Sequence, residues 1–102
     1  MRVIELDARE WTTVLDFYNA LLTALGAPEW HGRNANALMD SMIWGGINST
    51  NAPYTVRIVG ATKLPPEIRD EIDLIAKALV ISRAEYQRRR GADVDVTLYM
   101  EN

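Results

Sequence analysis

Stretches of alternating apolar and polar residues occur three times along the chain, at residues 2–6, 54–59 and 94–100. Alternation with period two is typical of half-buried β-strands. Between these stretches, apolar residues recur at spacings of three and four, which indicates amphipathic helices. Strands separated by helices pair in parallel through crossover connections. The pattern therefore predicts an α/β fold with a three-stranded parallel sheet, packed with three to four helices and more open on one face than a doubly wound sheet. Among the residues expected to share its core are Leu21, Ile58, Ile75, Val96 and Leu98.

The first helix is expected to end at Leu25, before Gly26, which supplies a C-terminal stop. Thr12 or Thr13 can cap its N-terminus, with Asp16 as the acidic partner of a Thr13 capping box. Its apolar stripe consists of Val14, Phe17, Tyr18, Leu21 and Leu25.

A long helical pattern begins at the two prolines of residues 65–66, which the first helical turn tolerates, and it ends before Gly91. Its buried stripe consists of Ile68, Ile72, Ile75 and Leu79. Ser82 and Glu85 have the spacing of a second capping box, which favours a break, whereas Tyr86 stays in phase with the stripe. One bent helix and two helices both fit this pattern.

The intervening segment, residues 26–47, is too apolar and aromatic for an ordinary surface loop and helix. Asn34 can cap a helix here, because its side-chain oxygen accepts from the free N–H groups of the first turn. The helix should run to about Ile43 or Trp44. One side has a core stripe of Ala35, Leu38 and Met42, with Ser41 beside them. The opposite, outward side holds Asn36, Met39, Asp40 and Ile43.

Aromatic residues flank this helix, with Trp30 and His31 just before it and Trp44 just after it. Together with the apolar and acidic outward face, they have the composition of a protein-binding surface. Each residue also has a plainer interpretation. Either tryptophan could roof the core, and His31 could be a rim contact or the polar edge of a loop. Asp40 taken alone could be an ordinary exposed helix acid.

The run PEWHGRNANALMD resembles the signature of the barstar family, intracellular protein inhibitors of the bacterial ribonuclease barnase, whose pattern is roughly P-E-Y-Y-G-x-N-x-D-A-L-x-D. Trp30 and His31 replace the two tyrosines with other rings. The residues that match outright are Pro28, Glu29, Gly32, Asn34, Ala37, Leu38 and Asp40.

The resemblance implies a barstar-like fold and an immunity protein that occludes the active site of a bacterial ribonuclease toxin. In the family, the last aspartate of the motif, here Asp40, sits where a substrate phosphate would lie. A carboxylate can imitate a phosphate because it offers bidentate acceptors to guanidinium groups. Trp30 and His31 would cover the catalytic groups of the enzyme, and Gly32 would let the backbone of the loop approach the enzyme closely. The expected partner-binding residues are Trp30, His31, Gly32, Asn36, Met39, Asp40, Ile43 and Trp44.

Several positions depart from the family pattern. Asn36 replaces an aspartate, Met39 replaces a tryptophan, and the acidic contact of the late helix falls near Tyr86 or Arg88. Trp44 is displaced from the family's tryptophan in its loop. Fewer acids give weaker steering toward a basic enzyme. The expected partner is therefore a basic ribonuclease or ribonuclease-type toxin domain other than barnase, bound by a monomer in a 1:1 complex.

The chain of 102 residues is expected to form a single domain, residues 1–102, with one core. It has no cysteine, which suits a reducing cytoplasm, and no run that approaches a signal core or a membrane span. The net charge of −3 is uneven, because residues 1–50 carry six acids and three bases while the second half carries eight of each. An acidic first half disfavours direct binding of nucleic acid.

One histidine and no cysteine argue against a metal site or a cofactor, and no nucleophile motif or paired carboxylates support catalysis. Three classes remain open: the ribonuclease inhibitor, an interaction protein of the same fold whose partner is a non-ribonuclease toxin or a host regulator, and a small enzyme or RNA-binding domain. RNA binding would need a basic stripe among the aromatics. The basic triplet at 88–90 is explained more simply as a solvated helix end.

Overall fold

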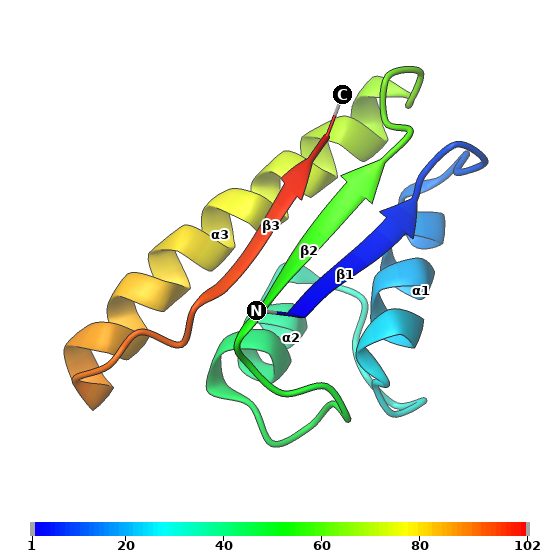
Figure 1. Cartoon of the computed structure of the whole chain (residues 1–102). Coiled ribbons are helices and arrows are strands. Elements are labelled where there is room, and N and C mark those ends of the chain that lie inside the picture. The colour runs from blue at the N-terminus through cyan, green and yellow to red at the C-terminus, as the bar shows by residue number, and fades with distance from the viewer. Residues whose placement is uncertain (1, 102) are drawn as a thin grey trace.

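A computed structural model describes residues 2–101 of the chain. It contains a three-stranded parallel sheet in the order β1-β2-β3 (Figure 1). The strands are β1 (Arg2–Asp7), β2 (Tyr54–Val59) and β3 (Val96–Met100). Their register places Ile4, Val56 and Leu98 in one buried row across the sheet. The sheet predicted from the alternation is confirmed.

The helical elements lie on one face of this sheet (Figure 1). They are α1 (Val14–Leu25), α2 (Ala35–Met39), the π-helix η1 (Asp40–Trp44) and α3 (Pro66–Arg90). In β2 the side chains of Tyr54, Val56 and Ile58 are buried, while the intervening side chains are only half-buried. The prediction of an α/β fold with three to four helices and one more open sheet face is confirmed.

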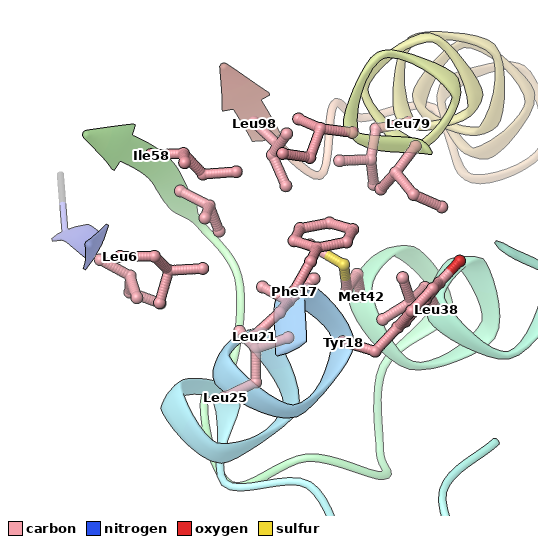
Figure 2. Close-up of a cluster of buried hydrophobic side chains, with 14 of the residues drawn as sticks. Leu6, Phe17, Tyr18, Leu21, Leu25, Leu38, Met42, Ile58, Leu79 and Leu98 are labelled. Carbon is pink, nitrogen blue, oxygen red and sulfur yellow. The ribbon is translucent and has the colours of Figure 1, made fainter. Parts of the chain in front are cut away.

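The core fills the space between the sheet and the helices. Figure 2 shows Phe17 of α1 lying among Met42 of η1, Leu79 of α3 and Leu98 of β3. These four side chains are buried and belong to one apolar cluster. That cluster also contains the other residues expected in the core, Leu21, Ile58, Ile75 and Val96.

The ends of α1 are closed as the sequence predicts. The Thr13 hydroxyl accepts from the N–H of Asp16 at 3.3 Å, and the Asp16 carboxylate accepts from the N–H groups of Thr13 and Thr12 at 3.0 and 2.8 Å. These two N–H groups lower the pKa of the Asp16 carboxyl. At the other end, Gly26 adopts the left-handed conformation with a φ of 66°.

One continuous helix, α3, runs through Ser82, which decides between the two patterns that the sequence allows. Glu85 does not cap a new helix, because its carboxylate binds Arg88 and Arg89, which follow one turn later. These two partners lower the pKa of Glu85. Tyr86 is half-buried against the core, in phase with the stripe.

The last strand begins at Val96, two residues later than the alternation predicts. Asp95 has a φ of 58°, which lies outside the extended region, so the regular strand begins only after it, although its carbonyl accepts from the N–H of Tyr54 at 3.3 Å. Arg83 of α3 holds this turn, because its guanidinium contacts Asp93 at 2.5 Å and Asp95 at 3.4 Å. Val94 still packs against the core from the turn.

Candidate protein-binding site

The segment singled out by the sequence is a loop followed by a helix that changes type midway. The carbonyl of Gly26 accepts from the N–H of Ser49 at 3.1 Å, which ties the start of the segment to the residues just after its end. Asn34 caps α2 as predicted, because its Oδ1 accepts from the N–H of Ala37 at 2.8 Å. These two hydrogen bonds hold the start of the loop and the start of α2 in place.

The second half of the predicted helix is the π-helix η1. Gly45 donates its N–H to the carbonyl of Asp40 at 3.1 Å, which is an i→i+5 bond. The wider turn advances each side chain through a smaller angle than an α-helix, so the buried and exposed sides shift. Ile43 is consequently 2% exposed and lies in the core with Met42. Its predicted outward position is wrong, and Ile43 supports the surface from below.

His31 is also buried, with 4% of its surface exposed. Its Nδ1 lies 2.7 Å from the carbonyl of Gly32, and its Nε2 lies 2.7 Å from Oγ of Ser41. A carbonyl can only accept, so Nδ1 donates its proton to the carbonyl of Gly32. The Ser41 hydroxyl also donates to the carbonyl of Leu38 at 3.3 Å. His31 is thus a buried residue of the loop that also lines a surface hollow, and its contact with a partner stays a prediction. The ring ties the loop to η1 from inside.

A hollow of about 100 Å³ opens between the loop and the start of η1. The residues that line it are Trp30, His31, Gly32, Ala37, Asp40 and Ile47. Trp30 is 74% exposed. Asp40 is exposed and forms no ion pair within residues 2–101. Four predicted contacts, Trp30, His31, Gly32 and Asp40, thus meet around one small depression.

Gly32 has a packing role in addition to the one predicted for it. A Cβ at this position would lie 3.1 Å from Nδ2 of Asn34 and 3.2 Å from Cβ of Ala37. Both distances are shorter than ordinary van der Waals contact. The absence of a side chain therefore lets the loop pack against the first turn of α2.

The remaining predicted contacts lie outside the hollow. Asn36 is exposed on α2, and Met39 is half-buried and packs partly against the core. Trp44 packs on Tyr86 of α3, with the two ring centroids 5.1 Å apart. The guanidinium carbon of Arg90 lies 5.6 Å from the centroid of the Trp44 ring, within cation–π range. Trp44 therefore belongs to a cluster with the end of α3.

Sequence reasoning missed the roles of four residues in this region. Ala37 and Ile47 line the hollow, and Tyr86 and Arg90 contact Trp44. Ile47 lies in the segment that the sequence singled out, but no spacing tied it to Trp30. Tyr86 carried a usable signal, because its phase with the buried stripe turns it inward. Arg90 carried none, since a cation in the last turn of a helix is the ordinary arrangement.

Within residues 2–101, no three acidic or histidine side chains are placed to hold a metal ion. None of the helices in that part of the chain is long and apolar enough to cross a membrane. Comparison with models of protein families matches residues 1–99 to the family described as Barstar (barnase inhibitor). No curated protein matches the chain significantly. The family match includes the hollow, β1, β2 and β3 up to residue 99.

Proposed function

The chain belongs to the barstar family, and from this membership we propose that it inhibits a bacterial ribonuclease by covering that enzyme's active site. The contact surface would be the rim of the hollow, with Trp30 and Asp40 as its two main contacts. One observation carries the proposal. The exposed ring of Trp30 and the carboxylate of Asp40, which forms no ion pair within residues 2–101, line the same hollow in the stretch that carries the family signature.

Asp40 would occupy the place of a substrate phosphate. A ribonuclease active site has to bind a phosphate, and a carboxylate offers the same cationic groups two charge-assisted acceptors. Asp40 forms no ion pair within residues 2–101, so binding would break no internal contact of that kind. Trp30 beside it would exclude water and thereby strengthen the electrostatic attraction.

Buried groups would keep this surface in shape before the partner arrives. His31 is held between Gly32 and Ser41, and Ile43 anchors η1 in the core. A surface that is already ordered loses less conformational entropy on binding. The two residues that sequence reasoning placed against the partner thus act as supports in this proposal.

The partner would be a basic ribonuclease or a ribonuclease-type toxin domain, bound 1:1 in the cytoplasm of the producing cell. The chain would act as an immunity protein and not as an enzyme, with no cofactor and no direct contact with RNA. Asn36 and Met39 stand where the family pattern has an aspartate and a tryptophan. We therefore expect a cognate enzyme other than barnase and poor inhibition of barnase itself.

A second candidate function is binding to another class of toxin or to a host regulator through the same fold. The cluster around Trp44 favours it. The guanidinium carbons of Arg89 and Arg90 lie 6.0 and 5.6 Å from the centroid of the Trp44 ring. Cations at this edge would be repelled by a partner that is cationic throughout. A partner with acidic groups opposite Trp44 would fit better.

Capture of the partner from the producing strain, followed by an RNA degradation assay, separates the two candidates. The assay compares Trp30→Ala and Asp40→Ala with Tyr99→Ala and Glu10→Ala, an exposed ring and an exposed acid outside the hollow. Loss of inhibition in the first pair alone supports the proposal. A partner that does not degrade RNA favours the second candidate. A tight complex that tolerates both Trp30→Ala and Asp40→Ala places the interface elsewhere.

A further inference from the structure

The outer face of α3 carries apolar side chains that the fold does not bury. Leu74 is 49% exposed, Val80 is 66% exposed and Ile81 is 72% exposed. Leu74, Lys77 and Ile81 are three and four residues apart and therefore lie along one side of the helix. The buried stripe that contains Ile75 and Leu79 lies on the other side. The middle of α3 is thus apolar on its outer side as well.

Charges of opposite sign flank this apolar patch. The exposed acids at the N-terminal end of α3 are Glu67, Asp70 and Asp73. The exposed bases at its C-terminal end are Arg88, Arg89 and Arg90. None of the three acids forms an ion pair within residues 2–101. Arg89 and Arg90 lie over the Trp44 ring, and Arg88 is paired with Glu85. The outer face of α3 therefore presents acids at one end, apolar residues with Lys77 in the middle, and the base Arg88 at the other end.

We propose that this face is a dimer interface, against which α3 of a second copy of the chain packs in antiparallel orientation. A two-fold axis sets residue i against residue j and residue j against residue i. Asp70 and Arg88 are 18 residues apart, which corresponds to about 27 Å along a helix. An axis at their midpoint, residue 79, brings each Asp70 to the Arg88 of the other copy.

The same axis places the apolar residues at the centre of the interface. Val80 lies next to the axis, and Ile81 of one copy faces Lys77 of the other. The aliphatic stem of a lysine can cover an apolar neighbour while its ammonium group reaches water. Apolar area is therefore buried in the middle, and charge pairs form at both ends.

The charge pattern indicates that the partner on this face of α3 is a second copy of the chain. A partner of a single sign would match one end of α3 and be repelled by the other, and a parallel copy would oppose like charges. Only the antiparallel copy matches both ends. One helix face makes a small interface, so we expect a weak, reversible dimer with a Kd on the order of micromolar to millimolar. Its attraction should weaken with salt.

Sedimentation velocity of the full chain at concentrations up to about 1 mM tests the proposal. Ile81→Arg should abolish the dimer. Asp70→Arg or Arg88→Asp alone should raise the Kd about tenfold or more, because two symmetric attractions become repulsions. The double variant, Asp70→Arg with Arg88→Asp, should restore dimerisation. Tyr99→Ser, on the exposed face of the sheet, serves as the control and should change nothing.

Cross-linking tests the orientation, because the chain has no cysteine of its own. A short thiol cross-linker should join Val80→Cys to its copy. It should not join Asp70→Cys, because the two copies of residue 70 lie about 27 Å apart along the helices. A chain that stays monomeric, a dimer that tolerates Ile81→Arg, or cross-linking at residue 70 in preference to residue 80 would overturn the proposal.

Discussion

Nε2 of His31 lies 2.7 Å from Oγ of Ser41, and this contact joins the loop that carries Trp30 to the π-helix that begins at Asp40. Both partners are buried. The two side chains that we propose as the main contacts are therefore positioned by a polar pair beneath them. The geometry of the surface depends on this buried pair.

Replacing His31 by Ala should destabilise the free protein. The change removes the side-chain partner of the Gly32 carbonyl and one of the two partners of the Ser41 hydroxyl, which costs about 1–3 kcal/mol in the free energy of unfolding. Urea unfolding without any partner measures the loss. Trp30→Ala is the control, because a residue that is 74% exposed should change stability by less than about 0.5 kcal/mol. Equal stability of the two variants would contradict the internal role of His31.

The burial of Ile43 can be tested by comparing its replacement with that of an exposed isoleucine. Ile43→Ala should lower the free energy of unfolding by about 2–5 kcal/mol, because it removes a filled core position. Ile81→Ala, at a position that is 72% exposed, should cost less than about 0.5 kcal/mol. Chemical unfolding of both variants gives the comparison. If Ile43 lay outward, as regular helical spacing predicts, the two losses would be similar and small.

The elements of the fold could be predicted from the sequence because the burial of one side of a strand or helix makes apolar residues recur at a regular spacing. Alternation located β1 and β2, and the stripe of α3 matched the residues that the structure buries. The stripe of α1 matched except that Val14 is only half-buried and Leu22 is buried as well. Thr13, Asp16 and Gly26 are local signals that close α1 without help from distant residues. The start of β3 was less predictable, because Val94 continues the alternation whereas the φ of Asp95 interrupts the strand.

The candidate site was only partly predictable, for two physical reasons. The angle of 100° per residue assumes α-helical hydrogen bonding, so the change to a π-helix at Asp40 moved Ile43 to the buried side. The environments of His31 and Trp44 depend on residues far along the chain, Ser41 and Tyr86. No spacing within the motif reports such contacts. Trp30 and Asp40 were placed correctly on the surface, where both side chains are exposed.

The way the free energy of unfolding falls at acidic pH should depend on Asp16. Its pKa is lowered by the N–H groups of Thr12 and Thr13. A carboxyl whose pKa falls on folding stabilises the protein above its unfolded value, near 3.9, and this stabilisation is lost as the pH drops through the folded value. Asp16→Ala should therefore be less stable than the native chain at neutral pH, and the gap should shrink below about pH 4. Urea unfolding at a series of pH values measures it, and a gap that does not change with pH would contradict this role.

Binding energy should be concentrated at Asp40 if the proposed function is correct. Truncation to Ala would leave the cationic groups of the partner's active site buried without a counter-charge, which costs about 3–5 kcal/mol of binding. This corresponds to an affinity loss of about 10²–10⁴-fold, expressed mainly as faster dissociation. Asp40→Asn should lose nearly as much, because it keeps the shape and removes the charge.

Surface plasmon resonance with the captured ribonuclease measures these rates, with unfolding curves to show that each variant is folded. Arg88→Ala is the charged control. Arg88 is an exposed side chain on the outer face of α3, so its removal should change binding by less than about 1 kcal/mol. Trp30→Ala should weaken binding together with Asp40→Ala, because both residues line the hollow. If Asp40→Ala and Arg88→Ala had equal effects, the carboxylate would not enter a cationic site, and the interface would have to lie elsewhere on the chain.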